Sequence, residues 1–403
     1  MQSKKLAIFL DLALFLLIFA VMIGRTITSQ ISRRMHGGKA IIILGARQVG
    51  KTTLLKGLFE GRKDVLWLTG DDPDVRAILE GMTTTLMRHY IGSANVVVID
   101  EAQRIADVGL KIKLITDGIP EVQVIATGSS AFEISGQVNE PLTGRKWEYI
   151  LHPLSFREMA AHHGLIEEQR LLTHRLVFGY YPDVVTNPGD EREVLTTLAT
   201  SYLYKDVLAV DRVKKSDAMS RLVQAIAYQV GSEVSMNELG QICGLDPKTV
   251  ERYVTLLEQA YIIFRLPSYS RNMRNELRRS RKIFFWDNGV RNAVIGNFAP
   301  VATRGDVGQL FENFVIAERI KQQQYARTFS RPWFWRTTTG QEVDYIEEQD
   351  GQIAAYEVKW NSRKRVSPPA AFRNAYPQAP FNIITPDSLP AFLIDGTTHS
   401  HIS

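Results

Sequence analysis

A glycine-rich loop with an adjacent lysine and threonine is the part of this sequence whose residue types and spacing best suit a chemical task. Gly45, Gly50, Lys51 and Thr52 fit the spacing G-x-x-x-x-G-K-[ST], with an apolar strand candidate before them and a helix candidate after them. The two glycines let backbone N–H groups turn toward phosphates, and the positive end of the following helix dipole adds to the attraction. The pattern predicts a phosphate-binding loop.

The side chains of this loop predict ATP and Mg²⁺ as its ligands. An ammonium at Lys51 suits the β- and γ-phosphates, and the hydroxyl of Thr52 is a hard oxygen ligand for Mg²⁺. The alternative is an ordinary strand, loop and helix with chance glycines, and the buried strand candidate before the loop argues against it. The residues expected to bind ATP are Gly45, Ala46, Arg47, Gln48, Val49, Gly50, Lys51, Thr52 and Thr53.

Two carboxylates follow the next strongly apolar run. The residues from Val96 to Ile99 are all aliphatic and end in Asp100 and Glu101, as in a strand buried on both faces of a parallel sheet. Asp100 is expected to hold Mg²⁺ through water, and Glu101 to polarise the water that attacks the γ-phosphate. The alternative is a strand that ends in a solvated acidic turn.

Hydroxyl side chains stand at the end of a further strand candidate, residues 122–127. In a sheet of this type that strand lies beside the acidic one, so Thr127 or Ser129 is expected to sense the γ-phosphate, and the sequence leaves open which of them does so. Arg145, after a glycine turn, is a third candidate for phosphate contact. It is equally interpreted as a solvated turn arginine.

The last third of the chain holds a second group of carboxylates. Asp344 and the Glu357-x-Lys359 pair have the order and strand context of the PD-(D/E)xK nuclease core, and Glu312 from a preceding helix is a further candidate. In such a core two carboxylates hold Mg²⁺ and the lysine positions a water. The alternative is exposed alternating charge on amphipathic strands, and the spacing reports ancestry better than activity.

A helix-turn-helix pattern precedes this region, between residues 235 and 260. A capped helix, a turn at Gly244 and a second helix after Asp246 are followed by a strand candidate that would form a wing. Lys248, Thr249 and Arg252 would then face a DNA major groove. The alternative is a helix pair that only packs domains together. The basic run expected to contact phosphates is Arg271, Arg274, Arg278, Arg279, Arg281 and Lys282.

These residues require a scaffold of alternating strands and helices. The alternation through residue 150 predicts an α/β doubly wound parallel sheet of the P-loop NTPase (AAA) type, with the nucleotide at the carboxyl ends of the strands. A helical and winged-helix region and a smaller α/β nuclease-like domain would follow. The expected division is 1–24 (apolar segment), 25–160 (ATPase domain), 161–230 (helical region), 231–285 (winged helix-turn-helix), 286–390 (nuclease-like domain) and 391–403 (tail).

Composition sets outer limits on partners. The 403 residues include 45% hydrophobic and 23% charged side chains, which is typical of a folded protein. A net charge of +5 permits nucleic acid or an anionic membrane as a partner without requiring either. The single cysteine, Cys243, excludes a disulfide within the chain and a cysteine-based zinc cluster, in agreement with a reducing cytosol.

An apolar run from residue 6 to residue 23 is interrupted only by Asp11. It is just long enough for a transmembrane helix. The alternative, which we favour, is a start site placed too early, with the true start at Met22. We therefore expect a cytoplasmic protein, or a protein anchored in a membrane by residues 6–23 with its ATP site in the cytoplasm.

Residues 22 to 385 resemble the bacterial and archaeal AAA-type predicted ATPases fused to a C-terminal domain of unknown function. The resemblance implies ATP binding with Mg²⁺, a winged-helix segment and a nuclease-like C-terminal domain. Residues 1–21 lie outside the family pattern, and Gly179-Tyr-Tyr-Pro182 stands where the family more often has paired glycines. The motifs that carry the resemblance are Leu44–Leu55, Val98–Gln103, Thr127–Ser130, Leu142–Arg145, Pro153–Phe156, Tyr204–Asp206, Phe311–Asn313, Glu342–Asp344 and Glu357–Lys359.

Three functions agree with these patterns. The first is an ATP-driven switch that moves the later domains against a protein partner, a nucleic acid or a second copy of the chain. The second is a Mg²⁺-dependent nuclease controlled by ATP, and the third is a DNA-binding regulator in which ATP stabilises the fold. The complete set of Lys51, Thr52, Asp100 and Glu101 favours hydrolysis of ATP over binding alone.

Overall fold

The structure, a computed structural model, describes residues 23–129, 141–202, 216–270, 281–361 and 367–395. Most of the apolar run at residues 6–23, and Arg271, Arg274, Arg278 and Arg279 of the basic run, lie outside these ranges. Within the described part of the chain, no helix combines the length and apolar character that crossing a bilayer requires.

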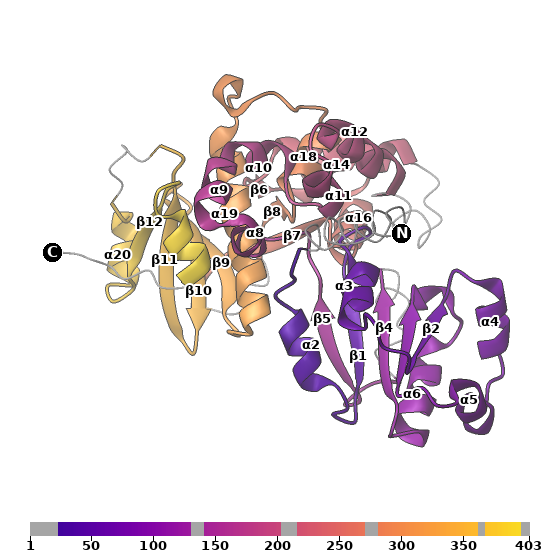
Figure 1. Cartoon of the computed structure of the whole chain (residues 1–403). Helices are drawn as coiled ribbons and strands as arrows, with labels where there is room; N and C mark the ends of the chain where they lie inside the picture. Colours follow the sequence, from indigo (N-terminus) through magenta and orange to yellow (C-terminus); the bar gives the residue numbers. More distant parts are fainter. Residues whose placement is uncertain (1–22, 130–140, 203–215, 271–280, 362–366, 396–403) are drawn as a thin grey trace, which may run out of the picture.

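A five-stranded parallel sheet forms the first part of the protein (Figure 1). Its strand order is β2-β3-β4-β1-β5, so the chain runs from β1 to the edge at β2, returns through β3 to β4 beside β1, and then passes to β5 on the other side of β1. The three inner strands are rich in aliphatic residues and are almost entirely buried, whereas the edge strands are partly exposed. The strands are β1 (Ala40–Leu44), β2 (Val65–Thr69), β3 (Val96–Asp100), β4 (Gln123–Gly128) and β5 (Lys146–Ile150).

Helices connect these strands, and the predicted α/β doubly wound fold is confirmed. The helix that follows β1 begins at Lys51, directly after the glycine loop. The carboxyl ends of β1, β3 and β4 therefore meet at the edge of the sheet that carries this loop. The helices of this part are α2 (Thr28–Arg34), α3 (Lys51–Leu58), α4 (Pro73–Leu79), α5 (Thr84–Ile91) and α6 (Val108–Gly118).

A layer of short helices follows β5 and packs on a later part of the chain. Asn292 donates hydrogen bonds to the carbonyls of Leu176 (3.1 Å) and Val177 (2.8 Å), which fixes α10 against α18 (Asn288–Val294). The amide therefore satisfies carbonyls at the end of a helix more than a hundred residues away. The helices are α8 (Phe156–His163), α9 (Leu165–Arg170), α10 (Leu172–Phe178), α11 (Pro182–Thr186) and α12 (Glu191–Thr197).

The predicted helix-turn-helix elements are present. Ser235 caps α15, Gly244 ends it with φ 67°, and Asp246 caps α16, as the sequence pattern indicated. Three antiparallel strands in the order β6-β8-β7 accompany the helices. The elements are α14 (Ser216–Tyr228), β6 (Glu233–Val234), α15 (Met236–Cys243), α16 (Pro247–Gln259), β7 (Ile263–Pro267) and β8 (Arg281–Phe285).

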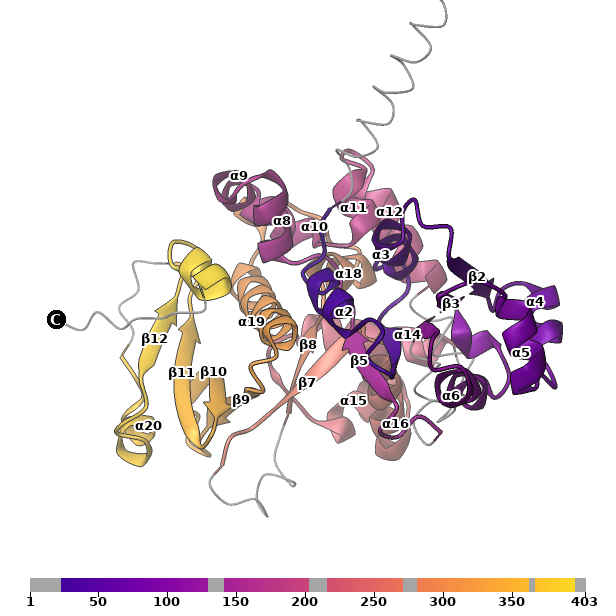
Figure 2. The same cartoon turned by 60° about the horizontal axis from the view of Figure 1, so that its bottom comes forward.

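The C-terminal part is a four-stranded mixed sheet beside a long helix, α19 (Figure 2). The order is β12-β11-β10-β9, with β11 and β12 parallel and the other neighbours antiparallel. The elements are α19 (Val307–Ala326), β9 (Arg331–Arg336), β10 (Glu342–Gln349), β11 (Gln352–Val358), α20 (Ala370–Ala375) and β12 (Phe381–Ile384).

The assignment of residues 391–395 to a tail was wrong. They form a helical turn in which Phe392 and Leu393 are buried. Arg319 of α19 donates a hydrogen bond of 2.7 Å to the carbonyl of Phe392 and stacks on its ring. This turn therefore covers α19 and belongs to the core of the C-terminal part.

Candidate functional site

The glycine loop adopts a conformation that only glycine permits at two positions. Gly45 has φ 151°, and a Cβ atom there would lie 2.2 Å from the carbonyl oxygen of Leu151. Gly50 has φ 92° and forms the N-cap of α3. The loop is thus pressed against the segment after β5, and its amides lead into the N-terminus of α3.

Lys51 lies inside this loop. Its side chain is 5% exposed, and its ammonium donates hydrogen bonds of 2.9 Å to the Gly45 carbonyl and 2.8 Å to the Ala46 carbonyl. A desolvated ammonium at the start of a helix is a strong anion-binding group, so the loop fits a phosphate chain. Among the other predicted ATP-binding residues, Val49 is buried, Arg47 is half-buried, and Gln48 and Thr53 are exposed.

The two predicted Mg²⁺ residues contact each other. Thr52 Oγ1 donates a hydrogen bond of 2.8 Å to Asp100 Oδ2, which joins the first turn of α3 to the end of β3. Thr127 Oγ1 donates to the other oxygen, Asp100 Oδ1, and accepts a hydrogen bond of 3.2 Å from the amide of Glu101. A hydroxyl and a carboxylate are both hard oxygen donors, so the pair fits Mg²⁺ bound beside phosphates.

Glu101 is held by a residue that the sequence analysis missed. Gln103 Nε2 donates a hydrogen bond of 2.5 Å to Glu101 Oε2, and Gln103 Oε1 accepts one of 3.3 Å from the amide of Ser129. Glu101 itself has φ 49°, which turns the chain sharply after β3. Gln103 therefore connects the ends of β3 and β4. The sequence feature that could have pointed to Gln103 is its position two residues after Glu101.

The hydroxyl candidates differ in their contacts. Thr127 orients the carboxylate of Asp100, as described above. Ser129 is 1% exposed, and its Oγ has no hydrogen-bond partner within the described residues. A buried hydroxyl without a partner costs free energy unless a ligand or water satisfies it. Ser129 is thus the better candidate for a polar contact to bound nucleotide.

The prediction that Arg145 contacts phosphate was wrong. Its carbonyl accepts a hydrogen bond of 2.9 Å from the amide of Ala40, at the start of β1, whereas the glycine loop follows the end of β1. Arg145 therefore lies at the opposite edge of the sheet. Its guanidinium pairs with Asp117 at 2.8 Å and is partly exposed, as in a solvated turn arginine.

Arg25 is a further residue that sequence reasoning missed. Its guanidinium donates hydrogen bonds of 2.7 Å to the Val49 carbonyl in the glycine loop and 2.6 Å to the His152 carbonyl after β5. It also pairs with Glu158 at 3.2 Å, and both side chains are almost fully buried. No periodicity or motif surrounds Arg25, so only the packing reveals its contact with the loop.

The carboxylates of the C-terminal part do come together. Lys359 Nζ lies 2.7 Å from Glu357 Oε1 and 3.5 Å from Asp344 Oδ2. Asp344 Oδ2 also accepts a hydrogen bond of 2.9 Å from the amide of Val358. Glu312 from α19 faces the same region, where burial and the charge of Asp344 raise the pKa of its carboxyl to about 8.

Lys282 lies within this cluster and not on a DNA-facing surface. Its side chain is 2% exposed, and its ammonium lies 3.0 Å from Glu312 and 2.5 Å from Glu342. Burial alone would lower the pKa of Lys282, but Glu312, Asp344 and Glu342 raise it above its usual value. The prediction that Lys282 contacts phosphates was therefore wrong, because the side chain neutralises carboxylates. In the described residues no group of three or more metal-binding side chains has ligand geometry.

The helix-turn-helix residues have mixed environments. Lys248 and Arg252 are exposed on α16. Thr249 Oγ1 instead donates a hydrogen bond of 2.5 Å to Asp246 Oδ2, so this hydroxyl serves the helix cap. Arg281 of the basic run pairs with Glu251 at 3.3 Å. Of the described candidates for DNA contact, Lys248 and Arg252 thus present charge on the helix surface.

Three family models match successive parts of the chain. Residues 37–160 match an AAA domain, residues 169–300 match a domain of unknown function (DUF8612), and residues 307–390 match another domain of unknown function (DUF4143). The AAA match contains the glycine loop and the acidic strand described above. Residues 37–160 therefore have the fold of a P-loop ATPase and are similar to an AAA domain, which supports ATP binding.

Proteins that match most of the chain share about a quarter of its residues or fewer. An uncharacterized protein of Mycobacterium tuberculosis (strain ATCC 25618 / H37Rv) is 24% identical over 348 residues, which are 85% of this chain and 75% of that protein. An uncharacterized protein of Haemophilus influenzae is 23% identical over 356 residues, which are 83% of this chain and 84% of that protein. Among solved structures, a Walker-type ATPase of Pyrococcus abyssi has a TM-score of 0.49 at 14% identity, over 68% of this chain and 96% of that one.

Proposed function

We propose that this protein hydrolyses ATP with Mg²⁺ and that the nucleotide state of the P-loop repositions its helical and C-terminal parts. The observation that carries the proposal is the hydrogen bond of 2.8 Å between Thr52 and Asp100. It joins a loop that fits phosphates to the strand whose carboxylates suit the metal and the attacking water. A protein that only bound ATP would not need Glu101 beside this pair.

The chain's own residues have separate roles in this proposal. The amides of the loop between Gly45 and Gly50 and the ammonium of Lys51 bind the phosphates. Thr52 and Asp100 would hold Mg²⁺, which would neutralise charge on the phosphates. Glu101 accepts the proton of the attacking water, and Gln103 keeps its carboxylate in place through their hydrogen bond of 2.5 Å.

A continuous set of contacts supports coupling between the P-loop and the C-terminal part. Arg25 holds the Val49 carbonyl of the loop and, through Glu158, the first turn of α8. At the same turn the amide of Phe156 donates a hydrogen bond of 2.7 Å to Glu318 of α19. A change in the loop would thus reach α19 through buried polar contacts with specific geometry.

A second contact at the exit of β5 supports the same coupling. The amide of His152 donates a hydrogen bond of 3.0 Å to the Tyr325 hydroxyl, and His152 Nε2 lies 2.6 Å from Gln324 Oε1. Both partners belong to the last turn of α19. Since the carbonyl of His152 accepts from Arg25, one residue links the loop, β5 and α19.

We infer that the C-terminal carboxylates now serve as an ion-pair network and not as a working nuclease. The support is the ammonium of Lys282 between Glu312 and Glu342, which neutralises charge that a divalent cation would otherwise balance. The elements from α14 to β8 support a winged helix, whose exposed Lys248 and Arg252 are the candidates for contact with nucleic acid.

Steady-state ATP turnover in the presence of Mg²⁺ tests the central proposal. Thr52→Val keeps the shape of the side chain and removes the hydroxyl, so turnover should fall while the fold persists. Thr52→Ser keeps the hydroxyl and is the matched control, which should retain turnover. Equal turnover in the two variants would contradict the assignment of Thr52, and absence of turnover in the wild-type protein would contradict hydrolysis itself.

A further inference from the structure

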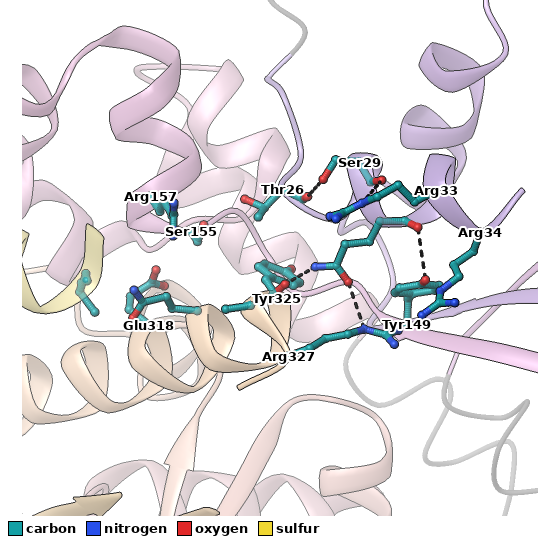
Figure 3. A pocket seen from close by; sticks show the side chains of 14 residues that line it. Thr26, Ser29, Arg33, Arg34, Tyr149, Ser155, Arg157, Glu318, Tyr325 and Arg327 are labelled. Atoms are coloured by element: carbon teal, nitrogen blue, oxygen red, sulfur yellow. Dashed lines mark hydrogen bonds between the residues drawn. The ribbon is translucent and has the colours of Figure 1, made fainter. Parts of the chain in front are cut away.

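A cavity of about 700 Å³ lies between the ATPase domain and the C-terminal part (Figure 3). Its walls come from four segments: α2, the stretch from the end of β5 to the start of α8, the second half of α19, and the turn Ala391–Asp395. The described residues that line it include none of the P-loop, so it is a different site from the ATP site. Four arginines line it, namely Arg33, Arg34, Arg157 and Arg327.

None of these four guanidinium groups forms an ion pair with a carboxylate in the described part of the chain. Arg33 Nε donates a hydrogen bond of 3.3 Å to the Ser29 carbonyl, and Arg34 lies 4.0 Å from the centre of the Trp147 ring. Arg327 Nε donates a hydrogen bond of 3.1 Å to Gln30 Oε1. Like charges gathered in one concave site repel one another and attract anions.

Helix ends explain only part of this charge. Arg33 and Arg34 occupy the last turn of α2, and Arg327 caps α19, where the helix dipoles favour cations. Arg157 is the second residue of α8, at the end where the dipole disfavours a cation. It is exposed, and in the described structure no carboxylate pairs with it. Within the described residues, neither the dipole of α8 nor an ion pair thus accounts for the charge of Arg157.

The acidic residue in the lining does not neutralise the arginines. Glu318 is 4% exposed, and its oxygens accept hydrogen bonds of 2.7 Å from Lys321 Nζ and 2.7 Å from the amide of Phe156. Its charge is thus balanced by Lys321, which is fully buried beneath it and does not line the cavity. The hydroxyl groups of Ser29 and Tyr149 donate hydrogen bonds of 3.4 Å to the Thr26 and Gln30 carbonyls, and each can still accept one. The Thr26 side chain also lines the cavity.

We propose that this cavity binds a ligand through its phosphate groups, either a free polyphosphate compound or the backbone of a single-stranded nucleic acid. Guanidinium groups match phosphate oxygens in geometry as well as charge. The volume is in the range of small-ligand sites. Because Arg33 and Arg34 precede the P-loop and Arg327 ends α19, such a ligand would hold the ATPase domain and the C-terminal part together.

Binding measured on the full-length protein tests this inference. All proteins in this experiment carry Lys51→Ala, so that the probes cannot bind through the lysine of the P-loop. The probes are inorganic tripolyphosphate and a short fluorescent single-stranded DNA. Arg33→Gln combined with Arg157→Gln removes two charges from the cavity. Arg88→Gln combined with Arg170→Gln removes two exposed arginines that pair with Glu121 and Glu167 elsewhere, and is the matched control.

We expect at least one probe to bind, with affinity reduced about tenfold for each cavity arginine removed and little changed in the control. Binding of tripolyphosphate identifies a free ligand, and binding of DNA alone identifies a nucleic-acid backbone. The inference is overturned if neither probe binds, or if both double variants weaken binding equally. Thermal melting of both variants confirms that they remain folded. Because every protein in this experiment lacks Lys51, a negative result would reject the cavity as a phosphate site without bearing on the proposed ATPase activity.

Discussion

The guanidinium of Arg25 donates a hydrogen bond of 2.7 Å to the carbonyl oxygen of Val49, in the middle of the glycine loop. The same guanidinium is paired with Glu158 at the start of α8. One buried side chain thus fixes the loop to the helix through which the ATPase domain contacts α19. The loop is positioned by tertiary contacts as well as by its glycines.

Arg25→Met should destabilise the protein and slow ATP turnover. It leaves the buried Glu158 without its cation, which costs about 3 to 5 kcal/mol. The double variant Arg25→Met with Glu158→Gln removes the uncompensated charge and should recover part of the stability. Its turnover should remain low, because Val49 still lacks its donor. Recovery of turnover together with stability would mean that Arg25 acts only as a counter-ion.

Lys51→Ala should abolish ATP binding. The substitution removes the ammonium that the loop holds on the Gly45 and Ala46 carbonyls, so the remaining site consists of backbone dipoles. Lys56→Ala changes an exposed lysine of the same helix and should leave binding intact. Titration with a fluorescent ATP analogue measures both variants. Unchanged affinity in Lys51→Ala would refute the assignment of the loop.

Glu101→Gln should bind ATP and Mg²⁺ but turn ATP over slowly. The amide keeps the size of the side chain and loses the charge that orients and deprotonates water, a role worth roughly 10²- to 10⁴-fold in rate. Glu80→Gln changes an exposed carboxylate of the same domain and should leave turnover unchanged. Loss of binding along with turnover would show that Glu101 is structural.

We expect the purified protein not to cleave DNA in the presence of Mg²⁺. Lys282 already neutralises the carboxylates around Asp344, so a divalent cation gains little by entering. Incubation of plasmid and single-stranded DNA with the protein and Mg²⁺, followed by electrophoresis, measures this. Mg²⁺-dependent cutting that is lost in Asp344→Ala and persists in Lys51→Ala would establish a nuclease independent of the ATP site.

Acid should destabilise the contact between β5 and α19 through His152. Burial, together with the charges of Lys321 and Arg25, lowers the pKa of His152 to about 3. Below its ordinary pKa of 6.5 the unfolded chain therefore binds a proton that the folded chain does not, and stability falls as the pH falls. Between pH 7 and pH 5 this amounts to about 2 kcal/mol.

Urea unfolding of the wild type and of His152→Phe at these two pH values measures this effect. Phenylalanine keeps a ring against Trp286, whose centre lies 4.1 Å from that of His152, and cannot be protonated. The loss of stability on acidification should therefore be smaller in the variant. Equal losses in the two proteins would show that other groups account for the pH dependence.

Local patterns predicted many of the elements and the positions of the candidate site residues on them. The glycine loop, the strand that ends in Asp100 and the caps at Ser235 and Asp246 depend on backbone preferences within a few residues of each position. Such preferences are set by the types of the neighbouring residues. For this reason the parallel sheet, the start of α3 and the helix-turn-helix elements could be predicted before the structure was known.

Contacts between distant segments could not be predicted in this way. Arg145 was assigned to the wrong edge of the sheet because the sequence pattern did not show that it precedes the fifth strand. Lys282 was grouped with surface arginines, since its burial against Glu312 depends on how β8 packs on α19.

The sequence by itself determined that this protein has a glycine loop of the P-loop ATPase fold, because the spacing of glycines, lysine and threonine dictates a local backbone conformation. Only the tertiary structure decided what surrounds that loop. Arg25 contacts it from outside any motif, and the arginine-lined cavity joins four segments that are distant in the chain. Burial and charge neutralisation are properties of the packed molecule, so they depend on all segments at once.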